Sequence, residues 1–180
     1  MTAKIYIALL HHPMYNKNRE VISTCITGFD LHDIARTALT FGIKKYYVVN
    51  PLPAQIAFAE RIINCWQGEK SFTHNWTRAE AFKHVKLKNT LEEVLKELKN
   101  PIVVATSAKK VGAVSYKLLK NKIKKAKRPF LILFGTGWGM TKDVLDKADV
   151  ILRPICGSKD YNHLSVRAAV AITLDRLVGS

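Results

Sequence analysis

Short, continuously apolar segments alternate with helical patterns along this chain, and that alternation limits the folds it can adopt. Residues 5–10, 102–105 and 130–134 lack the polar/apolar alternation of a half-exposed strand, so we expect strands buried on both faces. Apolar residues recur at helical spacing between them. Strands that alternate with helices predict a mostly parallel sheet with helices on both faces. We therefore expect one α/β domain over residues 1–180.

Three further segments carry local signals. Asp30 is expected to cap a helix with Asp33 in its first turn, and Gly42 is expected to end it. Residues 71–83 are less regular and predict a loop followed by a helical turn. Residues 115–127 predict an amphipathic helix whose polar side is rich in lysine.

The positive charge of the chain is concentrated in one region. The formal net charge is +15, and the segment from Pro101 to Lys142 contains ten basic residues but no Asp or Glu. A solvated helix face usually mixes both signs, whereas an unbalanced run attracts polyanions. The alternative explanations are solubility alone, or the lysine enrichment of a heat-adapted proteome, which normally brings glutamate with it. The charge pattern favours a nucleic-acid partner.

Several classes of protein are excluded by simple features. The longest apolar runs are shorter than the ~20 residues of a membrane span, and the first residues lack the pattern of a signal peptide. Cys25, Cys65 and Cys156 are far apart and form no C-x-x-C pair, which argues against a disulfide framework and a structural zinc site. We expect a cytoplasmic protein that needs neither a metal nor a membrane.

A glycine-rich segment at 135–139 is the first candidate binding site. Three glycines in five residues follow a predicted strand and precede a helix, where free backbone N–H groups could meet a nucleoside or an anion. The spacing matches neither the dinucleotide fingerprint nor the P-loop. A tight turn and a nucleotide-cofactor site remain the alternatives at this point.

Polar residues elsewhere add candidates. Arg36 lies on the first predicted helix, where a surface ion pair with Asp33 is the ordinary explanation. Residues 160–167 place more polar side chains at the start of the final predicted helix than a cap requires. His11 and His12, which end the first predicted strand, are further candidates for lining a site.

Taken in order, these segments resemble the SPOUT class of RNA methyltransferases. Residues 30–42 (DLHDIARTALTFG) are similar to the first motif of that class. Residues 131–139 (LILFGTGWG), continuing to 153–155 (RPI), are similar to the second, and 161–169 (YNHLSVRAA) are similar to the third. The resemblance covers most of the chain and is greatest to short, stand-alone bacterial members that use S-adenosylmethionine.

The resemblance implies a fold and an activity. The fold would be the α/β sheet expected above, with a deep trefoil knot in its C-terminal part. The activity would be methyl transfer from S-adenosylmethionine to a ribose 2′-oxygen or a base nitrogen of rRNA or tRNA, by a homodimer. The alternative is a non-catalytic RNA-binding or ribosome-associated protein of the same fold.

The resemblance also implies residue roles. Arg36, supplied by the other subunit, would act with Asn162, His163 and Ser165 at the catalytic centre. The residues implied to bind the methyl donor are Thr106, Ser107, Ala108, Phe134, Gly135, Thr136, Gly137, Trp138, Gly139, Ile155, Tyr161 and Leu164. Asp30 and His32 stand where ribose-methylating members usually have Asn and Gly, so the acceptor atom stays open between oxygen and nitrogen.

Overall fold

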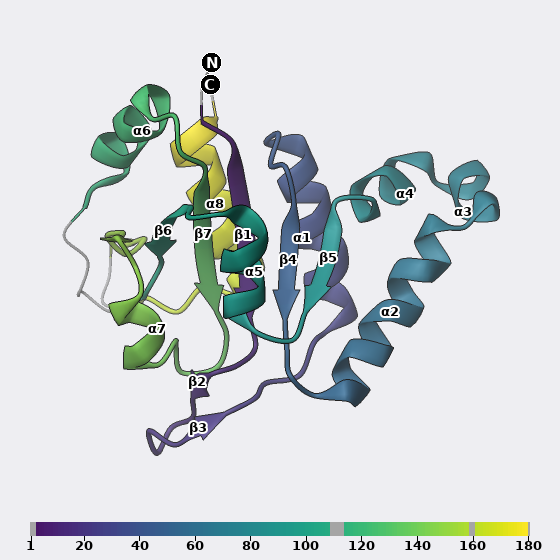
Figure 1. The fold of residues 1–180 in the computed structure, drawn as a ribbon, viewed down its shortest axis with the longest axis horizontal. Helices are drawn as coiled ribbons and strands as arrows, with labels where there is room; N and C mark the ends of the chain where they lie inside the picture. The colour runs from purple at the N-terminus through teal and green to yellow at the C-terminus, as the bar shows by residue number, and fades with distance from the viewer. Residues whose placement is uncertain (1–2, 109–113, 159–160, 180) are drawn as a thin grey trace.

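Six parallel strands form the central sheet of the computed structural model, which describes residues 3–108, 114–158 and 161–179 (Figure 1). The strand order is β5-β4-β1-β7-β6-β8, and each neighbouring pair is parallel. The strands are β1 (Ile5–Leu10), β4 (Tyr46–Val49), β5 (Val85–Lys88), β6 (Ile102–Ala105), β7 (Phe130–Gly135) and β8 (Val150–Ile151). A separate antiparallel hairpin joins β2 (Met14–Tyr15) to β3 (Val21–Ile22).

Helices cover both faces of this sheet, as predicted. They are α1 (Gly28–Thr40), α2 (Pro53–Gln67), α3 (Glu69–His74), α4 (Trp76–Phe82), α5 (Leu91–Leu98), α6 (Tyr116–Lys125), α7 (Lys142–Asp146) and α8 (Val166–Val178). Buried residues of α1, α2, α4, α6 and α8 share one core, and those of α5 and α7 share the other. The expected α/β fold with a parallel sheet is confirmed.

Alternate side chains of β1 show why the strands are continuously apolar. Ile7 and Leu9 belong to the core beneath α1 and α8, whereas Ala8 and Leu10 belong to the core beneath α5 and α7. All four side chains are almost completely buried. A polar side chain at any of these positions would be buried without water, so the alternation typical of a half-exposed strand is absent.

Two local predictions are wrong. Helix α1 begins at Gly28, and its cap is Thr27: the Asp30 N–H donates to Thr27 Oγ1 at 3.1 Å, and that hydroxyl donates back to Asp30 Oδ2 at 2.6 Å. Thr27 therefore supplies the capping oxygen one turn before the predicted position, with Asp30 as its reciprocal partner. Residues 71–83 are mostly helical, because the Asn75 side chain caps α4 by accepting from the Arg78 N–H.

The trefoil knot implied by the resemblance concerns the segments that follow β6 and β8. Residues 109–113 and 159–160 of those segments lie outside the described residues. What is described is a parallel bridge between Val114 and Leu152, with the Arg153 N–H donating to Val114 O at 2.9 Å. The knot stays a prediction. Among the described residues, no helix is long and apolar enough to cross a membrane.

Glu97, near the C-terminus of α5, anchors that helix to strands β4 and β5. Its carboxylate lies 3.0 Å from Lys45 Nζ, 3.1 Å from Lys86 Nζ and 3.0 Å from Lys88 Nζ, and it accepts from the Tyr47 hydroxyl at 2.9 Å. Burial raises the pKa of Glu97, but the hydrogen bonds from these four donors outweigh it and hold that pKa well below its usual range. The ionised carboxylate therefore stabilises the fold.

We predict that Glu97→Gln lowers the free energy of unfolding at pH 7. Because the pKa of Glu97 is depressed in the folded state, its contribution is present above the ordinary carboxyl pKa of 4.5 and is lost as the pH falls further. The gap between wild type and variant should thus narrow on acidification, in urea unfolding followed by circular dichroism. Glu60→Gln, an exposed change on α2, is the control. A gap that is constant from pH 7 to pH 3 would contradict the prediction.

Candidate active site

The carboxyl ends of four parallel strands meet at one edge of the sheet. Residue 11 follows β1, residue 50 follows β4, residue 106 follows β6, and Gly135 ends β7. The β1–β7 register pairs Leu10 with Gly135, so His11 and the glycine-rich segment are brought to the same place. Ligands of open α/β sheets bind outside this edge, which makes it the first place to look for a site.

A partly buried chain of hydrogen bonds joins His11 to the glycine-rich segment. His11 Nδ1 lies 2.9 Å from Thr24 Oγ1, which lies 2.5 Å from Thr136 Oγ1, and Thr136 donates to Leu10 O at 3.0 Å. Because the Thr136 proton goes to Leu10 O, Thr136 accepts from Thr24, and Thr24 accepts from His11 Nδ1–H. One direction of donation satisfies the whole chain and fixes the His11 tautomer.

His11 is held neutral by this environment. Its side chain is fully buried, and no partner for Nε2 is found within the described residues. A second ring proton would have no acceptor, and burial lowers the pKa of His11 from 6.5 to about 4. His11 thus supports the glycine-rich segment from below.

The glycine-rich segment packs against the β2–β3 hairpin. The Trp138 N–H donates to Tyr15 O at 3.0 Å, and the Tyr15 N–H donates to Gly139 O at 2.9 Å. Gly137 has φ +55°, and a Cβ there would lie 3.1 Å from Tyr15 O, so glycine is required by both conformation and space. The expectation that this segment leaves its N–H groups free is wrong for Thr136, Trp138 and Gly139, whose N–H groups donate within this assembly.

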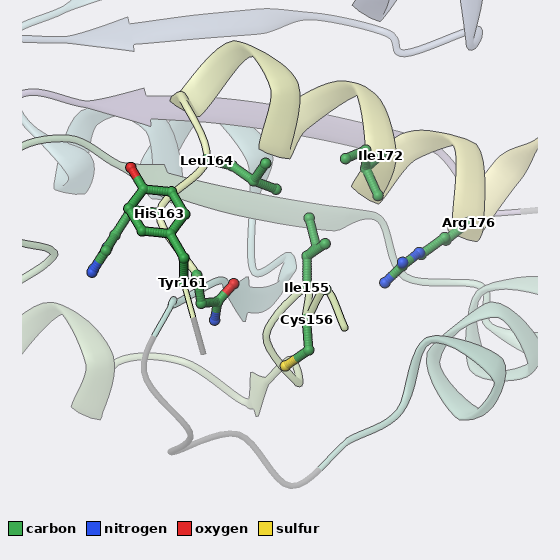
Figure 2. Close-up of a pocket in the computed structure, with 9 residues that line it drawn as sticks. Ile155, Cys156, Tyr161, His163, Leu164, Ile172 and Arg176 are labelled. Atoms are coloured by element: carbon green, nitrogen blue, oxygen red, sulfur yellow. The ribbon is translucent and has the colours of Figure 1, made fainter. Parts of the chain in front are cut away.

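A cavity of about 320 Å³ lies beside α8 (Figure 2). Ile172 and Arg176 project from α8, and Ile155 and Cys156 come from the segment after β8. The lining residues are Ile155, Cys156, Gly157, Tyr161, Asn162, His163, Leu164, Ile172 and Arg176. The wall is apolar with a few polar groups, which is the usual character of a small-molecule site.

The cavity brings together one part of the predicted site. Ile155, Tyr161 and Leu164 of the donor-binding set line it, as do Asn162 and His163 of the catalytic set. The Asn162 side chain also donates to Ala108 O at 2.9 Å, which ties the segment after β6 to this wall. The predicted residues that do not line the cavity are Arg36, Thr106, Ser107, Ala108, Phe134, Gly135, Thr136, Gly137, Trp138, Gly139 and Ser165.

Ser165 has a structural position at the start of α8. Its Oγ accepts from the Ala168 N–H at 3.3 Å and so caps the helix. Just before it, the Tyr161 and His163 rings meet edge to face with centroids 5.6 Å apart, and both side chains are exposed. A helix cap and an aromatic pair therefore shape the turn that presents Asn162 to the cavity.

Cys156 and Gly157 line the cavity within residues 155–164, a loop that the resemblance implies for the methyl donor, whereas sequence reasoning missed Ile172 and Arg176. Ile172 and Arg176 lie four residues apart, so they share one face of α8, and Arg176 stacks over the Tyr116 ring of α6 at 4.9 Å. Their spacing was visible in the sequence, but nothing in it shows that this face of the helix borders a cavity.

Arg36 is exposed on α1 and forms no salt bridge within the described residues. The ion pair considered above between Arg36 and Asp33 is absent: Asp33 Oδ2 lies 3.1 Å from Arg167 Nη1 of α8. Arg167 Nε also lies 3.6 Å from Asp30 Oδ1. The segments similar to the first and third motifs are thus joined by Arg167, and Arg36 has no salt-bridge partner in the part of the chain that the structure describes.

Comparison with known proteins identifies the family. Residues 4–179 match the model of a family described as SAM-dependent RNA methyltransferase. The chain belongs to this family. An uncharacterized protein of Aquifex aeolicus is 45% identical, with 96% of this chain and 87% of that protein aligned. A tRNA (guanine-N(1)-)-methyltransferase of Oleidesulfovibrio alaskensis is 36% identical over 97% of this chain, which spans 42% of the length of that relative.

Solved structures support the same fold. The SpoU methyltransferase AviRb from Streptomyces viridochromogenes, crystallised with the cofactor AdoMet, superposes with a TM-score of 0.62 at 13% identity, covering 99% of this chain and 58% of that one. The resemblance to SPOUT RNA methyltransferases is confirmed, and the cofactor of the family is S-adenosylmethionine (SAM). The cavity volume lies in the range of roughly 300–1,000 Å³ typical of small-molecule sites, and its mixed wall suits a cofactor with apolar and charged parts.

We predict that His11 makes this SAM-dependent RNA methyltransferase sensitive to acid. Since its pKa is depressed on folding, neutral His11 stabilises the protein above pH 6.5, and this contribution is lost as the pH falls toward 4. The loss should be on the order of 3 kcal/mol, because the pKa of His11 falls from 6.5 to about 4 on folding. His11→Asn keeps an N–H donor for Thr24 and removes the titration, so its free energy of unfolding should change less over this range.

Denaturant unfolding between pH 7 and pH 4 measures this difference. His74→Asn removes an exposed histidine and should leave the pH dependence as in wild type. Parallel curves for wild type and His11→Asn would show that His11 is not the group responsible.

Proposed function

We propose that this protein transfers a methyl group from SAM to one nucleotide of a tRNA or rRNA. The observation that carries the proposal is the cavity beside α8, whose wall contains residues 161–164 of the segment that is similar to the third SPOUT motif. SAM bound there would supply an electrophilic methyl group. Catalysis would then depend mainly on placing the acceptor nucleotide against it, and positioned polar side chains can do this without a metal.

Asn162 and His163 are the residues that we assign to the acceptor. Both line the cavity, and Asn162 is held in place by its bond to Ala108 O. His163 is exposed beside Tyr161, where its imidazole can accept the proton that leaves the acceptor oxygen or nitrogen. We assign the donor to the pocket formed by Ile155, Tyr161 and Leu164, closed by Thr106, Ser107 and Ala108.

The remaining predicted residues have supporting roles in this proposal. The glycine-rich segment, from Phe134 to Gly139, ends β7 next to β6 and would border the donor from the side of the sheet. Ser165 would act through the cap of α8 by holding the turn that carries Asn162 and His163. Trp138 is 63% exposed and would face bound RNA or donor.

We propose further that the active unit is a homodimer in which Arg36 serves the site of the other subunit. Within one chain, no α1 residue lines the cavity, so a single copy does not bring Arg36 to it. Phe29 of α1 is 71% exposed and Leu164 is 47% exposed, and Arg167 of α8 lies over the Phe29 ring at 5.3 Å. This apolar surface where α1 and α8 meet would be buried by a second copy, as isologous dimers require.

In that dimer Arg36 would bind the phosphate next to the acceptor, or the charge that develops as the methyl group moves. A planar guanidinium suits both tasks. We also propose that the protein works in the cytoplasm as a single domain over residues 1–180. Three exposed free cysteines, Cys25, Cys65 and Cys156, support a reducing compartment.

Isothermal titration calorimetry with SAM, S-adenosylhomocysteine and NAD tests the proposal. We expect micromolar binding of the first two and none of NAD. Incubation of the protein with methyl-labelled SAM and bulk tRNA or rRNA, followed by nucleoside analysis, then identifies the modified atom. RNA binding without binding of SAM would instead support a non-catalytic RNA-binding protein of this fold.

We predict that Gly157→Leu weakens SAM binding at least tenfold. Gly157 lines the cavity, and a Cβ there meets nothing within 4 Å, so the larger side chain fits without strain while occupying space near the donor. The melting temperature should stay unchanged. Gly68→Leu, at an exposed glycine with φ −73° far along the chain, is the control. Unchanged SAM affinity in Gly157→Leu would place the donor elsewhere.

Arg36→Ala should reduce methyl transfer by at least a hundredfold and leave SAM affinity intact, since Arg36 lies outside the cavity. Arg61→Ala removes an exposed arginine from α2 and should leave transfer near the wild-type rate. A fully active Arg36→Ala protein would show that Arg36 does not have the proposed role in methyl transfer.

Mixing variants tests whether Arg36 acts across the dimer. When Arg36→Ala and Gly157→Leu proteins are unfolded and refolded together, each mixed dimer contains one intact composite site. Assayed at a SAM concentration low enough that Gly157→Leu alone is almost inactive, the mixture should recover about a quarter of the wild-type activity. If Arg36 served its own subunit, every mixed dimer would keep an inactive site on both sides, and no activity would return.

A further inference from the structure

A second depression lies at the opposite edge of the sheet from the glycine-rich segment. It has a volume of about 440 Å³ and is lined by Ile102, Lys122, Lys125, Ala126, Arg128, Phe130, Asp149 and Val150. Ile102, Phe130 and Val150 are the first residues of β6, β7 and β8, so this groove opens at the amino ends of three adjacent strands. It shares no lining residue with the cavity beside α8.

The groove has an apolar floor and a cationic rim. Ala126, Phe130 and Val150 belong to the core cluster or pack against it and form the floor. Lys122 and Lys125 are exposed and lie three residues apart, so they project from the same side of α6. No salt bridge to either lysine is found within the described residues.

Arg128 is fixed in place at the rim. Its Nε donates to Asn100 O at 3.2 Å, and its Nη2 donates to Asn100 Oδ1 at 2.9 Å and to Pro101 O at 3.2 Å. These bonds hold the plane of the guanidinium while leaving Nη1 without a partner among the described residues. A cation whose orientation is already set loses little conformational entropy when it binds an anion.

Asp149 is the one acidic residue among those that line the groove, and one of its carboxylate oxygens is used in a hydrogen bond to the backbone. Asp149 Oδ2 accepts from the Val103 N–H at 2.8 Å, so this carboxylate helps to hold the start of β6. Three cations against one carboxylate leave the groove with a net positive charge. The surrounding segment continues that charge, because it contains no Asp or Glu from Pro101 to Lys142.

We propose that this groove docks a nucleotide of the RNA substrate that is distinct from the nucleotide being methylated. The floor takes the apolar face of a ribose and base, and Lys122, Lys125 and Arg128 bind the adjoining phosphates. We choose RNA as the occupant because the positive charge continues along α6 beyond the groove. The negative charge of a phosphodiester chain likewise continues beyond a single nucleotide. Contacts of this kind position a substrate without reading its sequence. The inference rests on the proposed RNA substrate and extends it to a second surface.

Two triple variants with the same loss of charge test the groove. One replaces Lys122, Lys125 and Arg128 with Ala, and the matched control replaces Lys117, Lys124 and Lys127, which are exposed in the same region but do not line the groove. The affinity of each protein for fluorescein-labelled bulk tRNA is measured by fluorescence polarisation over a range of salt concentrations.

We expect the groove variant to bind tRNA at least tenfold more weakly than wild type, and the control no more than threefold more weakly. Loss of three phosphate contacts should also reduce the slope of log K against log salt by about 2 to 3, at roughly 0.7–0.9 per contact. Arg128→Lys keeps the charge but loses the planar fork, so an intermediate affinity is expected. If the triple variant fails to fold, Arg128→Lys alone still tests the role of the groove in RNA binding.

Equal losses in the two triple variants would overturn the proposal, because the lysines would then act only through a diffuse field. Binding of a polyglutamate peptide that depends on the groove residues, with tRNA affinity unchanged, would assign the groove to an acidic protein and overturn it as well. Failure of the methyltransferase proposal looks different: SAM would not bind, while tRNA affinity would still separate the two triple variants.

Discussion

The parallel pairing of β1 with β7 is the constraint on which the rest of this structure depends. Its register sets Leu10 beside Gly135, and the hydrogen bond from Thr136 to Leu10 O continues that pairing past the end of the strands. Because both strands are buried on both faces, a shift of register would move a whole set of apolar side chains out of its core. The position of the glycine-rich segment is therefore fixed by the core, and His11 and Thr24 complete its support.

Around this fixed edge, rigid and accessible parts of the site are separated. The β2–β3 hairpin accepts from the Trp138 N–H at Tyr15 O and from the Thr136 N–H at Met14 Sδ, so these two groups of the glycine-rich segment are held by the protein itself. The wall of the cavity comes instead from exposed residues such as His163 and Leu164, placed by the cap of α8 and by the bond from Asn162 to Ala108. This combination would suit the proposed methyl transfer, which requires a fixed frame to set the geometry and an accessible wall to receive cofactor and RNA.

The sequence predicted the parallel sheet because buried strands such as β1 and β7 leave an unmistakable apolar run, and the ordered motifs identified the family. It did not predict the hairpin against Gly137, because contacts between residues more than a hundred positions apart leave no local periodicity. The cap of α1 was misplaced since Thr27 and Asp30 are both good capping residues and form one reciprocal pair. The partner of Asp33 was mistaken for a similar reason: Arg36 is a plausible partner on the same helix, but the packing of α8 brings Arg167 to Asp33 instead.

Lysines on the two sides of this sheet differ in how far nearby carboxylates offset their charge, so the distribution of charge over the molecule is asymmetric. Lys45, Lys86 and Lys88 share one carboxylate, Glu97, which offsets part of their charge and binds them to the fold. Lys122 and Lys125 on α6 have no such partner among the described residues. Lysines occur on both sides, but among the described residues the charge of Lys122 and Lys125 on α6 is not offset by an ion pair. Polyanions are steered by the field rather than by the number of cations, so RNA should approach α6 first and extend from there toward the cavity beside α8.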